Sequence, residues 1–415
     1  MSPHSESKTP LDIVASAREG RLRLFIRGTC LVVAAAAIWP VLPNANLLPF
    51  VPALSPFVAI GSLLGTRAFH ALTWLGFTVG IVALVRHRFF CRWICPVGLC
   101  VDGASLLGRR FGRRPMRAPL LGRWIVFITL GGALLGYPFL LWLDPLAIFA
   151  NVPFLARQST KHGMWLPAIG FGAIVILSII WPRAWCERIC PLGAIQDLLF
   201  LSRRFLHSII GRKGETHKKS IVGPRMARRT VLGIAAGVVW AWVARPVVSK
   251  MSPPLRPPGA RDESQFVGVC TRCGNCLRVC PSGIIERDVG QNGWANLFTP
   301  VLRFENDYCR EDCTRCTEVC PSGAIVRLSL KQKMGIQIGL PQVDMNMCLL
   351  GDDRECSVCK RWCPYDAIRY VFSETEYTLK PQIDPQKCNG CGACEAACPT
   401  KPRKAIVVIS CAAQS

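Results

Sequence analysis

Four runs of cysteines in the last third of this 415-residue sequence share one spacing, and thiolates at that spacing bind iron. Each run has three cysteines close together and a fourth that comes four residues after the third and directly precedes a proline. The first and last runs read Cys-x2-Cys-x2-Cys-x3-Cys-Pro, whereas the second and third lengthen only the first gap. The sixteen cysteines are Cys270, Cys273, Cys276, Cys280, Cys309, Cys313, Cys316, Cys320, Cys348, Cys356, Cys359, Cys363, Cys388, Cys391, Cys394 and Cys398.

This spacing predicts [4Fe–4S] clusters. Three thiolates on a tight loop each reach one iron atom of a cube, and in two-cluster ferredoxins the fourth cysteine ligates the neighbouring cluster. Structural zinc sites with four thiolates typically pair two Cys-x2-Cys doublets instead, so zinc is the weaker interpretation. We therefore predict four clusters, in which the first run pairs with either the second or the fourth. A short β-prone segment after each run fits a ferredoxin-like α+β domain with two tandem or nested 2[4Fe–4S] modules.

No Walker loop, dinucleotide fingerprint or Ser/His/Asp arrangement accompanies these cysteines in the sequence. Nothing therefore indicates bond-making on an organic substrate in this region. A row of clusters moves electrons one at a time, so the predicted function is electron transfer.

A second cysteine pattern occurs twice in the first half of the chain. Cys91 and Cys95 form one Cys-x3-Cys-Pro motif, and Cys186 and Cys190 form another, each after a pair of apolar stretches. Two copies of one unit related by a pseudo-two-fold axis would bring the pairs together. We predict that the four cysteines converge on one further Fe–S or metal site, with Cys100 as an alternative ligand.

The elements that must position these motifs are indicated by the apolar stretches, which lie at 24–42, 66–85, 122–143 and 164–182. Their lengths suit the hydrocarbon core of a bilayer. The three flanking segments 1–27, 86–123 and 183–229 hold 25 Lys and Arg, whereas the alternate loops hold two, Arg157 and Lys161. The positive-inside rule then places the N-terminus and the Cys-x3-Cys-Pro motifs in the cytoplasm. The expected fold is a multi-pass α-helical membrane domain of four helices plus a fifth, followed by the ferredoxin-like domain.

The fifth apolar stretch, Val231 to Val248, comes directly after Arg228 and Arg229, as in a twin-arginine export signal. An odd fifth helix places residues 251–415 outside the cytoplasm. We therefore expect a membrane domain at 1–205, a basic linker with this helix at 206–250, and a periplasmic polyferredoxin domain at 251–415. Nearly all of the net charge of +24 lies in the first 250 residues, which hold 30 Lys and Arg against 8 Asp and Glu, beside the apolar stretches, and this argues against nucleic acid as a partner.

On these motifs the chain resembles a fusion of two families. The part with the Cys-x3-Cys-Pro repeat is similar to the membrane ferredoxin-type subunits NapH, of periplasmic nitrate reductase systems, and MauN, of methylamine utilisation. The part with Arg228, Arg229 and four cluster motifs is similar to their exported partners, NapG and MauM. The resemblance implies an inner-membrane quinol dehydrogenase that passes electrons from the quinol pool to a periplasmic redox protein or reductase. One departure is that residues 191–229 contain no cysteine, whereas NapH-type subunits carry two further four-cysteine motifs there.

Three polar residues near the ends of the apolar stretches are candidates for quinol oxidation, which needs a proton acceptor. They are Asp144, Arg67 and His70. Ordinary polar residues at helix ends are the alternative interpretation. The alternative function is a reductive maturation factor that helps to assemble a periplasmic metalloenzyme.

Overall fold

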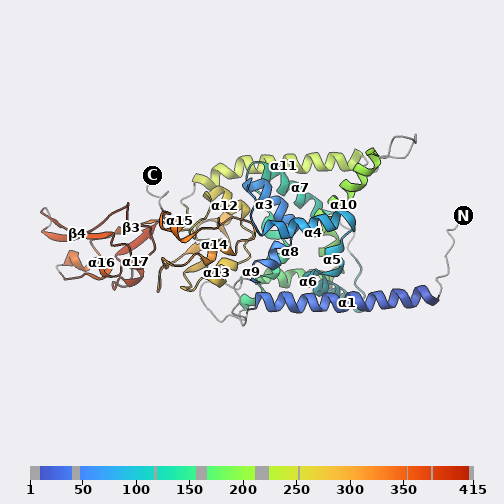
Figure 1. Ribbon diagram of the computed structural model, residues 1–415, viewed down its shortest axis with the longest axis horizontal. Helices are drawn as coiled ribbons and strands as arrows, with labels where there is room; N and C mark the ends of the chain where they lie inside the picture. Colours follow the sequence, from blue (N-terminus) through green and yellow to red (C-terminus); the bar gives the residue numbers. More distant parts are fainter. Residues whose placement is uncertain are drawn as a thin grey trace.

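The computed structural model describes residues 10–39, 47–115, 119–155, 166–210, 224–250, 253–352, 354–374 and 377–410. Arg157, Lys161 and Cys411 lie outside the described residues. Figure 1 shows an elongated molecule with a helical part at one end and a strand-containing part at the other. Helices α11 and α1 run along opposite sides of the helical part (Figure 1).

The helical part is built from eight longer and three short helices among the described residues. They are α1 (Pro10–Ile38), α2 (Phe50–Ala53), α3 (Pro56–Thr66), α4 (Thr73–Val85), α5 (Phe89–Trp93), α6 (Pro96–Arg110), α7 (Leu121–Leu134), α8 (Pro145–Phe149), α9 (Leu166–Ile180), α10 (Pro191–Ile210) and α11 (Pro224–Lys250). Proline fills the first position of α3, α6, α8 and α10, where its missing N–H costs no helical hydrogen bond. Each helix start fixes the position of the residue directly before the proline. Cys95 precedes α6 and Cys190 precedes α10 in this way.

Close backbone approach packs these helices in pairs. Helix α7 packs against α11, and α6 packs against α9. A side chain at Gly131 would collide with the carbonyl of Ile234, and one at Gly237 would collide with the carbonyl of Ile128. Glycine at these positions lets α7 and α11 lie in contact along their backbones.

The prediction of a multi-pass membrane domain is wrong. Within the described residues, one helical segment is long and apolar enough to cross a membrane, Arg228–Val248 of α11. The other apolar helices have 10–17 residues. At 1.5 Å per residue, 17 residues span about 25 Å, which is less than the roughly 30 Å of a hydrocarbon core. The stretch 122–143 shows why, because α7 ends at Leu134 and a turn with Gly136 at φ 78° comes next.

Among its described residues, the strand-containing part holds three two-stranded antiparallel sheets. They pair β1 (Ile285–Arg287) with β2 (Pro300–Leu302), β3 (Leu340–Val343) with β6 (Ile406–Ile409), and β4 (Ile368–Ser373) with β5 (Thr378–Ile383). Six short helices accompany them: α12 (Glu263–Val269), α13 (Asn275–Val279), α14 (Arg315–Glu318), α15 (Leu330–Met334), α16 (Val358–Arg361) and α17 (Ala393–Ala397). Strands come after three of the four cysteine runs, as the sequence predicts. After the second run there is a single bridge, between Ala260 and Ile325.

Candidate metal centres

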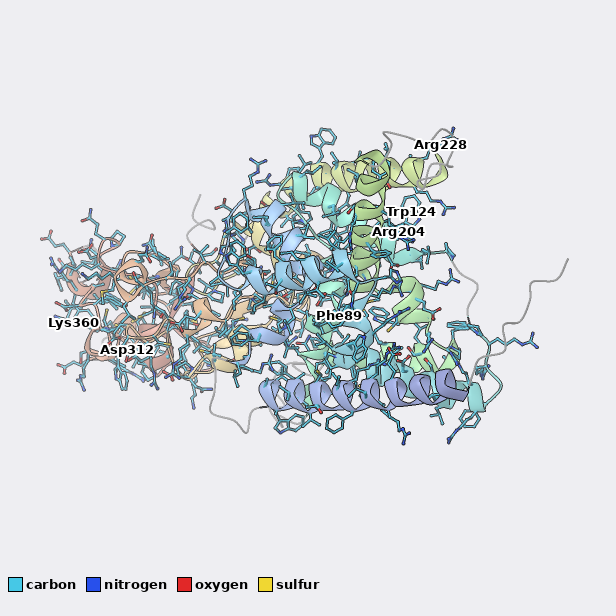
Figure 2. The ribbon with its side chains drawn as sticks, turned by 45° about the vertical axis from the view of Figure 1, so that its right-hand side comes forward. Phe89, Trp124, Arg204, Arg228, Asp312 and Lys360 are labelled. Carbon is cyan, nitrogen blue, oxygen red and sulfur yellow. The ribbon has the colours of Figure 1, made fainter. Side chains whose placement is uncertain are left out.

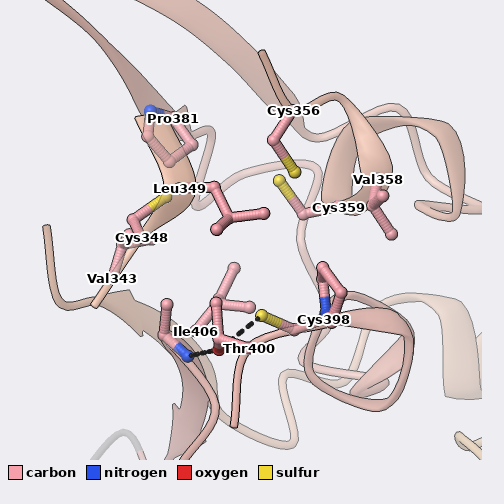
Figure 3. A pocket seen from close by; sticks show the side chains of 12 residues that line it. Val343, Cys348, Leu349, Cys356, Val358, Cys359, Pro381, Cys398, Thr400 and Ile406 are labelled. Carbon is pink, nitrogen blue, oxygen red and sulfur yellow. Dashed lines mark hydrogen bonds between the residues drawn. The ribbon is translucent and has the colours of Figure 1, made fainter. Parts of the chain in front are cut away.

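The sixteen cysteines of the four runs gather into four sets of four. We number the sets from the helical part outwards and call them sites 1 to 4. Site 1 contains Cys270, Cys273, Cys276 and Cys320, site 2 contains Cys280, Cys309, Cys313 and Cys316, site 3 contains Cys363, Cys388, Cys391 and Cys394, and site 4 contains Cys348, Cys356, Cys359 and Cys398. Figure 3 shows the four cysteines of site 4 around a small pocket.

Each site takes three cysteines from one run and the fourth from a partner run. The first run exchanges its fourth cysteine with the second, and the third run exchanges with the fourth. The first run therefore pairs with the second run and not with the fourth, a choice that the spacing alone left open. A proline after each fourth cysteine ends the local helical turn, so that the chain leaves its own site and reaches the next one.

Local structure presents the sulfur atoms to each pocket. Helices α13 and α17 begin after Gly274 and Gly392, whose φ angles of 73° and 83° are readily adopted only by glycine. Backbone N–H groups then donate to sulfur, from Ile325 to Cys320 at 3.4 Å and from Ala367 to Cys363 at 3.4 Å. Such donors stabilise thiolate over thiol.

The four sites are arranged one after another in a single row. Sites 1 and 2 are neighbours, because Cys276 and Cys316 interact electrostatically. Sites 2 and 3 are joined by the backbone, where the N–H of Cys309 donates to the carbonyl of Cys391 at 2.9 Å. Site 1 adjoins the helical part, since Cys273 packs with Ala147 of α8. Lys360, next to Cys359 of site 4, lies at the opposite end of the molecule from Arg228 (Figure 2).

The chemistry of these donor sets fits iron–sulfur clusters. Burial and the charges of neighbouring cysteines raise the pKa of Cys276 well above that of a free thiol. Burial likewise raises the pKa of Cys391 to about 12. Four thiolates in one buried pocket therefore require a positively charged group between them. In the described part of the chain, no three His, Cys, Asp or Glu side chains are spaced for a single metal ion. The thiolates of a [4Fe–4S] cluster bind four different iron atoms.

The two Cys-x3-Cys-Pro motifs also come together, inside the helical part. Cys95 and Cys190 are buried in one apolar cluster, and Cys91 and Cys186 pack against it. Burial raises the pKa of Cys91 to about 11, and burial and the other three cysteines raise that of Cys190. We call these four cysteines the helical-body site.

Reciprocal ion pairs link the two halves around the helical-body site. Arg88, three residues before Cys91, binds Asp197 of the second copy through Nε at 2.6 Å and Nη2 at 2.5 Å. Arg183, three residues before Cys186, binds Asp102 of the first copy through Nε at 3.2 Å. Each arginine adopts a positive φ, 51° and 61°. The two copies are therefore related by an approximate two-fold exchange of equivalent contacts.

Two family models match the chain over these cysteines. A 4Fe–4S dicluster domain matches residues 269–324 and 354–401, two ranges that together contain every cysteine of the four runs except Cys348. A 4Fe–4S binding domain matches residues 67–114 and 163–211, each of which holds one Cys-x3-Cys-Pro motif. No solved structure shows significant similarity to the chain.

Curated relatives align with much of their own length. Ferredoxin-type protein NapF of Escherichia coli is 35% identical over 151 residues, which are 36% of this chain and 83% of the relative. The chain belongs to the ferredoxin-type protein family. Ferredoxin-type protein NapG of Escherichia coli is 33% identical over 181 residues, 41% of this chain and 77% of the relative. Methylamine utilization ferredoxin-type protein MauM of Methylobacillus flagellatus is 29% identical over 195 residues, 44% of this chain and 80% of the relative.

The similarity to NapG and MauM confirms that half of the predicted resemblance, and it supports the iron–sulfur electron-transfer role of this ferredoxin-type protein. The resemblance of the helical part to NapH and MauN stays a prediction. The assignment of individual cysteines as cluster ligands also stays a prediction, although the way the cysteines group together fits it.

The three candidate residues for quinol oxidation occupy different surroundings. Asp144 is fully buried and caps α8, accepting hydrogen bonds from Ser55 Oγ at 2.5 Å and from two backbone N–H groups. Arg67 is exposed at the end of α3. His70 lies against Gly323 of the second cysteine run, 3.4 Å from Arg261 Nη2. The structure therefore brings His70 close to site 1, while Asp144 is held in a helix cap.

Sequence reasoning missed the arginines around site 1. Arg272 and Arg278 lie within the first run, and Arg287 comes after it in β1. Arginine is common beside cysteine runs in this chain, so its position along the sequence gave no signal. What distinguishes these three is full or partial burial without an acidic partner in the described residues, which only the folded structure reveals.

Proposed function

We propose that this ferredoxin-type protein transfers electrons through four [4Fe–4S] clusters held at sites 1 to 4. The observation that carries the proposal is the exchange of fourth cysteines together with the hydrogen bond between Cys309 and Cys391. The exchange couples the sites within each pair, and the hydrogen bond couples the pairs. A continuous row suits one-electron carriers, which need neighbouring centres rather than a substrate pocket.

The helical-body site extends this proposal to a further Fe–S cluster or metal. Its support is the convergence of four buried cysteines and the match of a 4Fe–4S binding model over both motifs. Helix α8 connects this site to the row. Asp144, at the start of α8, interacts electrostatically with Cys95, and Ala147 and Ala150 pack with Cys273 of site 1. One short helix therefore touches both centres.

Quinol as electron donor and a periplasmic redox protein as acceptor form the finer part of the proposal. They rest on the resemblance to NapH and NapG, and so does the location of residues 251–415 in the periplasm. His70 and Arg261, which contact Gly323 beside Cys320, give site 1 polar groups that a quinol could approach. Burial raises the pKa of Asp144 to about 6, a value that suits a proton acceptor at neutral pH.

Iron analysis and quinol addition on the full chain, purified without oxygen, test both parts. Four clusters hold about sixteen iron atoms, and a fifth cluster at the helical-body site raises this to about twenty. Replacing Cys91, Cys95, Cys186 and Cys190 by alanine should then return the content to about sixteen. A fully reconstituted wild type with about eight iron atoms would contradict four clusters.

In the same preparation, a quinol is expected to bleach the cluster absorption, and Asp144→Asn is expected to slow this bleaching at unchanged iron content. Clusters that dithionite reduces but quinol does not would rule out quinol as the donor. That result would leave the row of clusters intact as a proposal.

A further inference from the structure

Three guanidinium groups surround site 1 on the side of the helical part. Arg287 is 2% exposed, and its Cζ lies 4.4 Å from the ring centre of Phe154. Arg278 lies over the same ring at 5.5 Å, and Arg272 lies over Trp142 at 5.2 Å. The arginines therefore lie over aromatic rings, with Arg287 shielded from water and Arg272 and Arg278 partly shielded.

These groups lie close enough to the cysteines of site 1 to interact with them electrostatically. A side chain at Gly274, between two cysteines of the first run, would collide with Nη2 of Arg287. Arg287 interacts electrostatically with Cys270, Cys273 and Cys276, and Arg278 interacts with the last two. The positive charge is thus directed at three of the four ligands of site 1.

The three arginines lack acidic partners in the described part of the chain. Their hydrogen bonds go to neutral acceptors, from Arg287 to Asn151 Oδ1 at 2.6 Å, from Arg278 to the carbonyl of Ile38 at 3.0 Å, and from Arg272 to the carbonyl of Ala295 at 3.0 Å. Nε and Nη1 of Arg287 have no hydrogen-bond partner among the described residues. Arginine keeps its charge in proteins, so this charge is compensated only when an anion occupies site 1.

The other sites have less buried positive charge. Site 2 has one buried ammonium group, Lys333, which donates to the carbonyls of Arg310 and Cys313. Over the ranges that the structure describes, no fully buried Lys or Arg lies at sites 3 and 4, where Lys404 is partly exposed beside the carbonyl of Cys398. Positive charge that is buried or partly buried is therefore greatest at site 1, smaller at site 2 and smallest at sites 3 and 4.

We infer that Arg272, Arg278 and Arg287 give site 1 the most positive reduction potential of the row, so that it is the first centre to hold an electron. The inference rests on the proposed clusters. Reduction adds one negative charge to a cluster, and an unscreened guanidinium stabilises the reduced form more than the oxidised form. The arginines act through the cluster's potential: they determine which site is reduced first and do not themselves bind the cluster.

A redox titration followed by electron paramagnetic resonance tests this on the full chain. Arg287→Gln is expected to shift the most positive reduction wave to lower potential and leave the remaining waves in place. Arg287→Lys retains a charge and should restore much of the shift. Arg327→Gln is the matched control, because it removes the same charge from an exposed position in the same module and should move no wave.

Iron content separates the possible results. Full iron with no wave moved, or with a wave other than the most positive one moved, would overturn the inference while the clusters remain. Arg278→Gln provides an independent variant and is expected to shift the same wave. Loss of the iron of one cluster in both glutamine variants would also overturn it, because the arginines would then hold the site together rather than tune it. A wild type without clusters would instead reject the proposed function.

Discussion

Asp144 combines two properties that a carboxylate seldom has together, complete burial and a place at the start of a helix. Its oxygens accept hydrogen bonds from Ser55 Oγ and from the N–H groups of Leu146 and Ala147. These donors favour the charged form, but burial outweighs them and raises the pKa to about 6. The buried charge of Asp144 therefore lowers the stability of the folded protein at neutral pH. In mild acid the carboxyl group is protonated, and this loss of stability disappears.

Replacing Asp144 with asparagine should reveal this cost, because asparagine also caps helices but carries no charge. The folded pKa lies above the unfolded value of 3.8, so the folded state binds the proton more tightly and the wild type gains stability as the pH falls below about 6. Between pH 7 and pH 5 this gain is about 1 kcal/mol, and the variant should lack it. Urea unfolding followed by circular dichroism at both pH values measures the difference.

Asp262→Asn is the control, since Asp262 precedes α12 and makes no cap hydrogen bond. Its substitution should leave the pH dependence of unfolding as in the wild type. If Asp144→Asn shows the same dependence as the wild type, Asp144 does not carry a raised pKa.

At the scale of elements, the helical-body site depends on helices from two copies of one unit. Helices α6 and α10 both begin directly after a cysteine, and each carries the aspartate that pairs with an arginine of the other copy. The two pairs are not equal. Asp197 has 11% of its side chain exposed, and Asp102 has 31%.

This inequality predicts different costs for the same substitution. Asp197→Asn removes the bidentate carboxylate partner of Arg88 in mostly buried surroundings. We therefore expect a loss of about 2 kcal/mol or more in the free energy of unfolding. Asp102→Asn removes a more exposed carboxylate, which pairs with Arg27 at 2.7 Å and with Arg183 at 3.2 Å, and it should cost less, about 1 kcal/mol. Chemical unfolding of the two variants side by side measures the difference. Equal losses would mean that the two copies contribute equally to the interface.

The sequence predicted the parts of these elements that depend on local chemistry. The Cys-x3-Cys-Pro repeat predicted that the two cysteine pairs come together, and all four cysteines lie in or against one apolar cluster. The predicted membrane spans were wrong because the length of an apolar stretch does not show where a helix within it ends. Gly136, at positive φ, comes just after the end of α7 within a stretch that looks continuous in composition, and α4 begins only at Thr73 although its stretch was expected to begin at residue 66.

For the cysteine runs, spacing predicted which residues gather but not which runs exchange. The connecting segments are similar in length, and the exchange depends on contacts such as the hydrogen bond from the Asn275 side chain to the carbonyl of Val319, which joins the first run to the second over 44 positions. The arginines of site 1 were missed for a related reason. Their importance lies in the absence of acidic partners in the described surroundings, a property of the packed molecule.

At the scale of the whole molecule, the exchange of ligands makes the effects of cysteine substitutions non-additive. Cys270 and Cys320 belong to different runs but to one site, whereas Cys270 and Cys309 belong to different sites. Adding Cys320→Ala to Cys270→Ala should therefore remove little further iron. Adding Cys309→Ala to Cys270→Ala should remove about as much again as the first substitution. Iron analysis of the three variants, purified without oxygen, provides the measurement.

The reverse pattern, in which Cys320→Ala adds to Cys270→Ala and Cys309→Ala does not, would assign the cysteines by run rather than by exchange. The variant Cys280→Ala serves as a second check, because it belongs with Cys309 in site 2.

The exchange of fourth cysteines also determines the order in which the sites receive their last cysteine while the chain is synthesised. The helical-body site has its last ligand once Cys190 has been synthesised, sites 1 and 2 become complete together at Cys316 and Cys320, and sites 3 and 4 at Cys394 and Cys398. No run can finish a centre before its partner run emerges from the ribosome. Under the proposed function, iron can therefore be delivered in three successive steps, from the N-terminal half of the chain to its C-terminal part, and a ribosome that stalls between Cys280 and Cys316 leaves sites 1 and 2 incomplete.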